Sequence, residues 1–511
     1  MRCCQTILFL GIVILSLSFG AEKAVQSMPA TARCPVPPED DWTSQEKFVW
    51  ERVCVGEIAD FNKEAAFGGK LDPRKLGTLP EDRILRQAFL ETILFDERHR
   101  SIIARRGVRI FGARFPELID LQNAALQNEL WLDGCLLEGG ADLSWLKSTQ
   151  PIAIRGSRVG DALNMYGLQV DSNVFLDGSE FTDVTLVGAT IGHTLDLSGS
   201  SVSGTLDLDS LRVGVHLHMR DAELAEIVLH NAHVPSQLTL ERSKVSGLLN
   251  MYGIQVGKVL LMNNSEFAEV NLENAHIGGQ LDFSGSTFHQ NVRLNGAHIG
   301  GALQFVSIDR AAQWSEHGIL DLRNARADVI PSLSAPWPNK LDLNGLTYRS
   351  SGIVGSDFNS WFDKLLGYSR QPYEQLATVL QTQGDADTAT AIRYSARDRE
   401  RREAPSPVRH WLRLLDLVVG YGYYPERSFG WAALFVILGA VVLRVSGEGP
   451  KNGMPFGLAY SFDMLLPIVR LREKHYSIDL AGPARYYFYG HRIMGWVLAS
   501  FLVAGISGLI K

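Results

Sequence analysis

The chain has 511 residues, of which 46% are apolar and 21% charged, and this apolar content excludes an intrinsically disordered protein. Five cysteines are too few for a disulfide-rich scaffold, and the spacing of Cys and His matches no zinc site. The net charge of -7 is unevenly distributed, because residues 110–350 hold 27 acidic and 15 basic residues, a balance of -12. This acidic middle argues against binding to duplex DNA.

The N-terminal segment has the pattern of a signal peptide. Arg2 precedes an uncharged apolar run over residues 6–19, and the small residues Gly20 and Ala21 suit cleavage. The run has about 14 residues, too few to span a bilayer core of about 30 Å comfortably. We therefore predict a signal peptide at residues 1–20, with a short uncleaved anchor as the alternative. Both interpretations predict export of the domain that follows.

Residues 21–106 are predicted to form an N-terminal helical cap region. Leu85, Phe89 and Ile93 recur at helical spacing and fall on one face. An open β-helix end would present unpaired strand edges, and we expect this region to cover the first coil.

Three cysteines remain once the signal peptide is removed. Cys34 and Cys54 are a candidate disulfide in an oxidising compartment. Cys135 is then left over, and we expect it to be a buried apolar residue rather than a nucleophile.

The middle of the chain is an internal repeat. Large apolar residues recur over 195 residues, at fifteen intervals of 11 and three of 10. Residues 164–167 (NMYG) return as residues 250–253, within an 86-residue near-duplication. Such regularity is typical of a solenoid. The ladder consists of Ile110, Leu121, Leu132, Leu143, Ile154, Met165, Leu176, Leu186, Leu197, Leu208, Met219, Leu229, Leu240, Met251, Met262, Leu272, Phe283, Leu294 and Phe305.

The chemistry of the repeat favours strands over helices. Gly, Asn, Asp and Ser, which break helices and supply turns, fill the positions between ladder residues. A second apolar ladder, including Ile277, Phe288 and Ile299, falls between the residues of the first. Two 11-residue units then make one coil of about 22 residues with about four short faces, rising by about 4.8 Å. We predict a parallel β-helix over residues 107–350, with about nine coils along the ladder.

Three pentapeptides carry a family resemblance: residues 141–145 (ADLSW), 270–274 (VNLEN) and 341–345 (LDLNG). They resemble the pentapeptide-repeat family of right-handed β-helices, which implies a mainly β, right-handed solenoid. The whole chain also resembles bacterial membrane proteins that join such repeats to two C-terminal membrane helices. Residues 373–377 (YEQLA), 420–422 (GYG) and 460–467 (YSFDMLLP) carry this second resemblance, which implies no settled activity.

Residues 351–405 are predicted to form a helix pair followed by a basic linker. Residues 411–419 are expected to lie on the membrane surface beyond this linker. The second helix ends in a run of arginines that we expect to contact anionic lipid headgroups. This run comprises Arg397, Arg399, Arg401 and Arg402.

Residues 406–511 are predicted to form an α-helical membrane region. Two uncharged apolar stretches indicate transmembrane helices at about 428–445 and 490–510. Aromatic residues stand near the ends of both stretches, where interfacial anchors are common. With the exported rod, these helices predict a multi-pass inner-membrane protein.

A third apolar stretch, residues 454–469, lies between the predicted spans. Tyr460, Asp463 and Pro467 within it are a candidate re-entrant or pore-like element, because a carboxylate at membrane depth is costly and usually functional or close to water. No glycine-rich carbonyl loop follows Pro467, as a potassium filter would require. We therefore favour an interfacial helix at the level of the headgroups.

The histidines and aspartates of the repeat indicate neither a metal site nor a catalytic site. His276 and His298 are 22 residues apart and should stack outward on adjacent coils, while His216 and His218 share one face. Neither pair has an obvious third ligand for a metal. Aspartates that directly precede ladder residues are expected to form a solvated face rather than a catalytic pair. These are Asp196, Asp207 and Asp282.

The sequence thus predicts no catalytic, cofactor-binding or metal site and no cofactor. We interpret the chain as a non-enzymatic, membrane-anchored β-helix with a periplasmic rod. Its acidic surface would meet a protein or envelope polymer, its helices would meet membrane lipid, and nucleic acid is not expected. Two alternatives remain: a two-helix pore with an accessory β-helix, and an enzyme that acts on an envelope polysaccharide.

Overall fold

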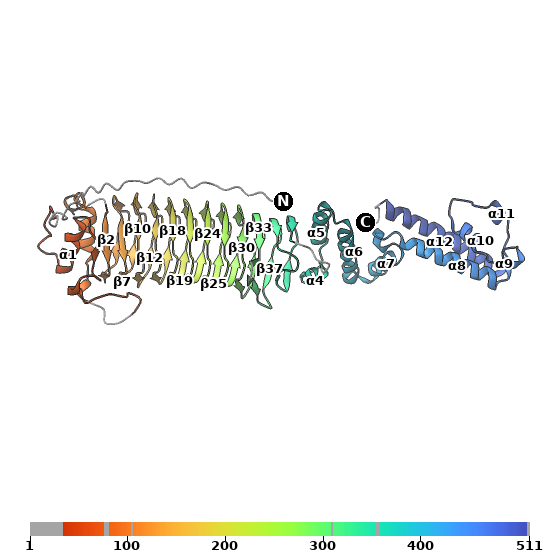
Figure 1. Cartoon of the computed structure of the whole chain (residues 1–511), viewed down its shortest axis with the longest axis horizontal. Helices are drawn as coiled ribbons and strands as arrows, with labels where there is room; N and C mark the ends of the chain where they lie inside the picture. Colours follow the sequence, from red (N-terminus) through yellow and green to blue (C-terminus); the bar gives the residue numbers. More distant parts are fainter. Residues whose placement is uncertain (1–33, 76–80, 104–105, 308–309, 353–357, 508–511) are drawn as a thin grey trace, which may run out of the picture.

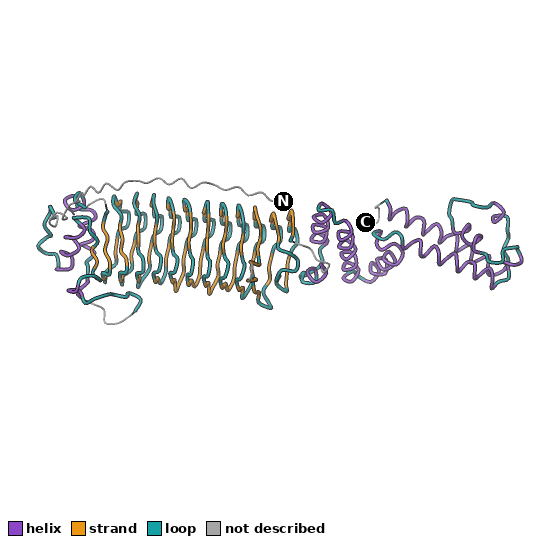
Figure 2. The backbone as a smooth tube through the Cα atoms, viewed as in Figure 1, coloured by secondary structure: helices purple, strands orange, loops and turns teal. Residues whose placement is uncertain are grey.

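The chain is elongated, with a rod of stacked strands at one end and α-helices at the other (Figure 1). Short helices precede the rod, and the chain then runs along it once before entering a helical neck and a helical end (Figure 2). The computed structural model describes residues 34–75, 81–103, 106–307, 310–352 and 358–507. The predicted signal peptide at residues 1–20 lies outside these ranges.

The rod is a parallel β-solenoid of about 11 turns. It extends from β2 (Val108–Phe111) to β40 (Thr347–Ser351). The turns before the insertion at residues 306–318 have 22 or 21 residues, since Ile152 pairs with Val174 and Val174 with Leu195. A single turn contributes one short strand to each of four faces, as the ladder predicts. One example comprises β6 (Leu130–Asp133), β7 (Leu136–Leu137), β8 (Ala141–Asp142) and β9 (Lys147–Ser148).

The rod is longer than the nine coils expected from the ladder. After Phe305 the chain makes a small antiparallel excursion, β34 (Val306–Ser307) and β35 (Arg310–Ala311), before the stack resumes. The next buried residues of the same ladder are Leu322 and Leu343. The inserted residues break the 11-residue interval, and this hides the last turns from a search for periodicity.

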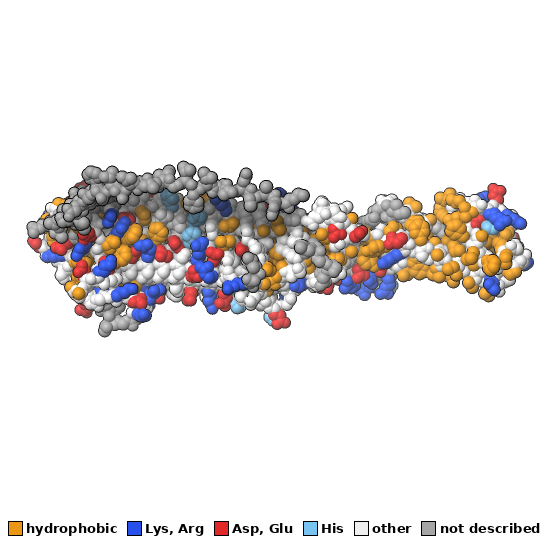
Figure 3. All heavy atoms as spheres, viewed as in Figure 1, with side chains coloured by type: hydrophobic (Ala, Val, Ile, Leu, Met, Phe, Trp, Pro, Cys, Tyr) orange, Lys and Arg blue, Asp and Glu red, His pale blue; other side chains and the backbone are white. Residues whose placement is uncertain are grey.

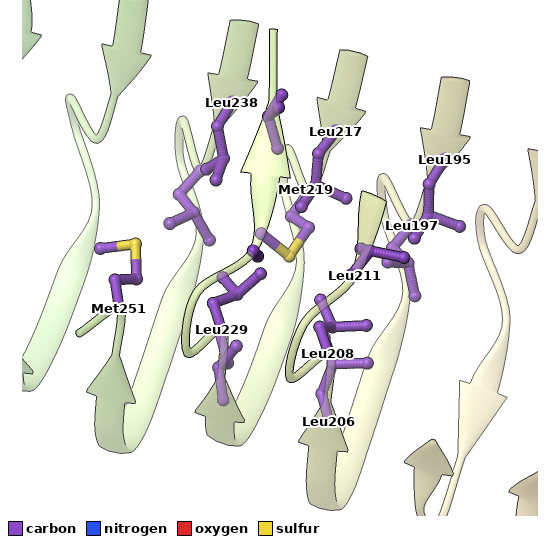
Figure 4. Close-up of a cluster of buried hydrophobic side chains, with 14 of the residues drawn as sticks. Leu195, Leu197, Leu206, Leu208, Leu211, Leu217, Met219, Leu229, Leu238 and Met251 are labelled. Atoms are coloured by element: carbon purple, nitrogen blue, oxygen red, sulfur yellow. The ribbon is translucent and has the colours of Figure 1, made fainter. Parts of the chain in front are cut away.

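The ladder residues form the core of the rod. All nineteen are at most 2% exposed, and burial of each such side chain stabilises the fold by about 1.5–3 kcal/mol. Figure 4 shows Leu195, Leu206 and Leu217 with their ladder neighbours, all pointing into the interior between the strands. Ala189 and Ala232, where the interior has room only for a methyl group, are also fully buried.

The corners explain the abundance of Gly and Asn between ladder residues. Successive turns change direction at a residue with positive φ, such as Asn231 (50°), Asn264 (56°) and Asn274 (56°). Only Gly, Asn and Asp adopt this left-handed conformation readily. The turn positions therefore select residues that a helix disfavours, and the repeat forms strands.

A column of buried serines lines a further corner. The hydroxyl of Ser179 donates to the carbonyl of Ile154 on the preceding turn (2.8 Å) and accepts from the backbone N–H of Ser157 (3.1 Å). Equivalent hydroxyls satisfy backbone groups that would otherwise be buried without a partner, and Ala222 takes the serine position in the turn between Ser200 and Ser243. The column comprises Ser157, Ser179, Ser200, Ser243, Ser265 and Ser286.

The N-terminal region packs against the first turn of the rod. It contains α1 (Ser44–Val53), β1 (Ala59–Asp60), α2 (Gln87–Phe95) and α3 (Glu97–Arg100). Strand β1 continues the sheet, with Ala59 opposite Ile110 of β2. Leu85, Phe89 and Ile93 are buried together, as their spacing predicts.

The helical neck begins with α4 (Phe358–Phe362), followed by α5 (Arg370–Thr382) and α6 (Ala386–Glu403). Helices α5 and α6 lie side by side, and the turn between them is fixed by Asp385, whose side chain accepts from the backbone N–H of Thr388 at 3.0 Å. Helix α7 (Ser406–Val419) leads from the neck into the helical end.

The helical end contains two long helices, α8 (Arg427–Val445) and α12 (Gly482–Ile506), which pack against each other (Figure 1). Among the described residues, α8 is the one helix long and apolar enough to cross a membrane, with a mean hydropathy of 2.0. The second predicted span falls on α12, which includes His491 and Arg492 and whose last predicted residues, 508–510, lie outside the described part.

Candidate functional site

The helical end exposes an unusual amount of apolar surface (Figure 3). On α8, Phe429 is 63% exposed, Ile437 55% and Val445 83%. On α12, Ile493 and Val503 are similarly exposed. Soluble domains rarely present contiguous apolar surface of this extent, which marks a protein or membrane contact.

Helix α7 has an apolar exposed face beside exposed basic residues. Trp411, Leu414 and Leu417 face outward, while Leu412 packs against the neck. Arg409 and Arg413 are also exposed. This combination is typical of a helix that lies in the interface between headgroups and acyl chains.

Asp463 lies in α10 (Leu458–Leu465), and its side chain is fully buried. Its carboxylate accepts hydrogen bonds from the backbone N–H groups of Leu471 (3.0 Å) and Arg472 (3.2 Å). Nδ1 of His475 lies 2.9 Å from the same carboxylate, and the hydroxyl of Tyr476 donates to the Asp463 carbonyl (3.1 Å). The carboxylate therefore fastens the returning chain to α10.

Helix α10 packs against both α8 and α12. A Cβ on Gly439 of α8 would collide with the hydroxyl of Ser461, and one on Gly495 of α12 with the carbonyl of Leu465. Small residues let α10 approach both long helices closely. The chain therefore enters alongside the bundle, turns after Leu465, and returns.

The other two residues of the predicted re-entrant element have different surroundings. Tyr460 is buried, with its ring centroid 5.5 Å from that of His475 and 5.2 Å from that of Phe488. Pro467 is half-buried in the turn that follows α10. Asp463 and Tyr460 thus share the partner His475, whereas Pro467 shapes the turn.

A second buried polar contact in this region was not predicted from the sequence. Nε2 of His491 on α12 lies 2.9 Å from the carbonyl of Ser461 and 3.5 Å from its hydroxyl. His491 is 2% exposed. A single histidine in an apolar helix gives no periodic signal, so its partner could not be read from the sequence.

The arginine run at the end of α6 is largely neutralised by acidic residues of the same helix. Arg397 pairs with Glu400 (3.0 Å), and Arg399 with Glu403 (3.1 Å). Both Arg401 and Arg402 pair with Asp398. These pairs leave less free positive charge for lipid headgroups than the sequence run indicates, and Arg409 and Arg413 of α7 are better placed.

The aspartates that precede ladder residues shape turns. Asp196 accepts from the backbone N–H of Ser198 at 2.9 Å, and Asp207 accepts from that of Asp209 at 3.1 Å. Asp282 accepts from Ser284 at 2.9 Å. Such side chains hold the backbone in an Asx turn, which explains their repeated position.

The two histidine pairs stack on the rod surface as their spacing predicts. The rings of His276 and His298 are 5.7 Å apart and inclined by 5°, and those of His216 and His218 are 5.2 Å apart. In the described part of the chain, no three His, Cys, Asp or Glu side chains are grouped so that they could hold a metal ion.

The three described cysteines have distinct environments. Cys34 and Cys54 are paired as a disulfide, with Cα atoms 5.6 Å apart. Cys135 is fully buried, and this burial raises the pKa of its thiol to about 12. It occupies the position that serine takes in the following turns, since its backbone N–H donates to the hydroxyl of Ser157.

No family model, curated protein or solved structure matches the chain. The parallel solenoid is consistent with the pentapeptide-repeat-like β-helix that the sequence resembles.

Proposed function

We propose that this chain is a non-enzymatic, membrane-anchored β-solenoid that presents its rod as an interaction or scaffolding surface in the cell envelope. In this proposal α8 and α12 cross the inner membrane, and the rod stands on the periplasmic side. The solenoid is right-handed and of the pentapeptide-repeat type, and residues 21–106 cap its first turn.

The contrast between the two ends of the molecule carries this proposal. Ladder side chains of the rod are turned inward, whereas large apolar side chains of α8 and α12 are turned outward. Only 22% of the most apolar stretch of α8 is buried, so α8 lacks the enclosure of a core helix in a soluble protein. Surrounding acyl chains would remove this surface from water.

The neck supports a particular placement of the membrane surface. The exposed apolar side chains of α7, Trp411 and Leu414 among them, would enter the interface, and Arg409 and Arg413 would meet anionic headgroups. Since α7 precedes α8 directly, the interface would lie at the junction between the neck and the helical end. The rod would then project away from the membrane.

Fractionation of the full-length protein tests the anchoring. The protein should sediment with membranes, resist extraction by alkaline carbonate and require detergent for release. Replacing Ile437 and Val441 on the exposed face of α8 by Arg should abolish this resistance, because a charge at the bilayer centre costs about 3 kcal/mol. The matched replacement of both by Leu should retain it. Release of the unaltered protein by carbonate would refute the proposal.

A pore is the second candidate, supported by one observation. Helix α10 packs against both long helices and turns back after Leu465, as a re-entrant segment would. The carboxylate of Asp463, however, already accepts from Leu471, Arg472 and His475, and this leaves it poorly placed to attract cations. Ion flux through reconstituted bilayers distinguishes the two candidates.

A further inference from the structure

One face of the rod carries an uninterrupted column of basic and amide side chains. Its residues occupy β20 (Arg212–Val213), β23 (His233–Val234), β26 (Gln255–Val256), β29 (His276–Ile277), β33 (His298–Gln304) and β38 (Arg326–Ile330). We term the six in-register residues Arg212, His233, Gln255, His276, His298 and Arg326 the basic column. Because neighbouring strands lie about 4.8 Å apart, the column extends about 24 Å.

No acidic residue belongs to the basic column, and the acidic residues closest to it in sequence are Asp209, Glu273 and Asp328. Asp328 pairs with Arg349 at 3.4 Å, and Asp209 lies 3.8 Å from His230. Two residues beyond the first five members of the column stand Gly214, Pro235, Gly257, Gly278 and Gly300, and Asp328 stands two beyond Arg326. A Cβ on Gly214 would collide with the carbonyl of Gly192 on the preceding turn, so bare backbone adjoins the column. Among the described residues, neither Arg212 nor Arg326 has an ion-pair partner. The column therefore offers two arginines without ion-pair partners among the described residues, in a rod whose overall balance is acidic.

Exposed aromatic rings line the corner that leads into this face. Tyr252 precedes Gln255 by three residues and is 42% exposed, and its ring lies 6.4 Å from that of His230. Tyr166 and Trp145 stand at the same corner four and five turns before Tyr252, 44% and 48% exposed, with their rings 5.3 Å apart. We term these four residues the aromatic edge.

Trp145 is held in a conformation that its side chain disfavours. Its φ is 59°, whereas the same corner in other turns is occupied by Asn, Ser or Gly, such as Asn231 and Ser210. The ring covers Gly167, where a Cβ would come within 2.6 Å of it. A bulky residue in left-handed backbone that stays half exposed is an outlier of the kind found at binding sites.

We propose that the aromatic edge and the basic column together bind an anionic polysaccharide that lies along the rod. Sugar rings present apolar C–H faces, which stack on Trp and Tyr rings, and their acidic groups would meet Arg212, Arg326 and the histidines. The inference rests on the proposed function, because it names the envelope polymer that the rod would engage.

Single-stranded nucleic acid is recognised by the same combination of stacking rings and positive charge. The remainder of the rod disfavours it, because a phosphate on every nucleotide would be repelled by the balance of -12 over residues 110–350. A polysaccharide with sparser charge suits one narrow basic column in an acidic rod.

Calorimetric titration of the full-length protein in detergent micelles tests the inference, with a hyaluronan oligosaccharide of about eight sugars, which carries a carboxylate on every second sugar, as the probe. It should bind more tightly than the neutral cellohexaose, and its affinity should fall with salt. Trp145→Asn and Tyr252→Ala should each weaken binding about tenfold, the effect of removing one stacked ring. Arg212→Gln should weaken binding and reduce the salt dependence, whereas the matched Arg158→Gln on another face should not.

Trp145→Asn separates binding from folding, because Asn is favoured in left-handed backbone and the variant should melt no lower than the unaltered protein. Unchanged affinity in both aromatic variants would overturn the inference. Tighter binding of a 20-nucleotide oligodeoxythymidine than of the polysaccharide probe would also overturn it, and would identify the ligand as nucleic acid. Absence of hyaluronan-oligosaccharide binding in a preparation that resists carbonate extraction would refute this inference alone and leave the membrane anchoring intact.

Discussion

Nδ1 of His475 lies 2.9 Å from the carboxylate of Asp463, and both side chains are buried beside two long apolar helices. The same carboxylate accepts two backbone hydrogen bonds from the chain that leads to His475. Every contact fastens the returning segment to α10. We therefore assign Asp463 a structural role at the point where the chain turns back.

Asp463→Asn should lower thermal stability in detergent and leave membrane conductance unchanged. The amide retains one acceptor but loses the charged partner of His475, at a cost of about 1–3 kcal/mol. Thermal unfolding and planar-bilayer recording measure the two effects, with exposed Glu473→Gln as the control. A cation-selective current that the Asn variant abolishes would establish the pore instead.

Leu197→Asp and Ser198→Asp should differ strongly in stability although they are adjacent. Leu197 is fully buried. Even an uncharged polar group without a hydrogen-bond partner costs about 4–8 kcal/mol there on an alkane scale, and an unpaired charge costs more. Ser198 is partly exposed, so its replacement should cost little. Melting of the two variants is the measurement, and equal losses would disprove the register of the rod.

The serine column predicts different effects on stability for two small substitutions. Ser179→Ala leaves the N–H of Ser157 and the carbonyl of Ile154 without their partner, and should cost about 1–3 kcal/mol. Cys135→Ser should be nearly neutral, because it extends the column by one turn. Denaturant unfolding of both variants compares them, and a severe loss for Cys135→Ser would contradict this reading of the column.

Glu46 is expected to make a pH-dependent contribution to the stability of the N-terminal region. Burial alone would raise its pKa, but hydrogen bonds from Arg86 and from the backbone of Thr43 outweigh burial and lower the pKa. The stabilisation is therefore present above the unfolded pKa of about 4.3, and is lost as the pH falls through the lowered folded value.

Glu46→Gln should accordingly lower the melting temperature at pH 7 and have progressively less effect as the pH is lowered towards 3. Near-ultraviolet circular dichroism during heating is the measurement, and the exposed Glu97→Gln serves as control. An effect that grows on acidification would show that the carboxylate is not stabilised in the fold.

The periodic part of this fold was predictable because each turn needs large apolar side chains at the same interior positions. Leu197 and Leu208 meet the same interior one half-turn apart, so the interval of 11 residues is visible in the sequence. The serine column was missed because serine is common and only one residue per turn belongs to the column. The turns around Leu322 lie within the predicted rod, residues 107–350, but were left out of the count of coils, because an insertion changes the spacing without ending the stack.

The helical end was less predictable, because its contacts join residues with no fixed interval. The sequence singles out Asp463 by its charge in an apolar stretch but cannot name His475 as its partner. In the sequence, the run from Arg397 to Arg402 appears as free positive charge. Asp398 and Glu400 come within reach of these arginines only when the helix forms. Pairing along a helix therefore changed the interpretation of a charged segment.

The side of the membrane on which the rod lies tests the central claim most directly. A reporter fused after Gly352, at the end of the rod, should be active as a periplasmic alkaline phosphatase and silent as a cytoplasmic fluorescent protein. This outcome is expected because the N-terminal segment acts first and long domains translocate largely regardless of charge. A silent phosphatase with a bright cytoplasmic fluorophore at the same position would contradict the account.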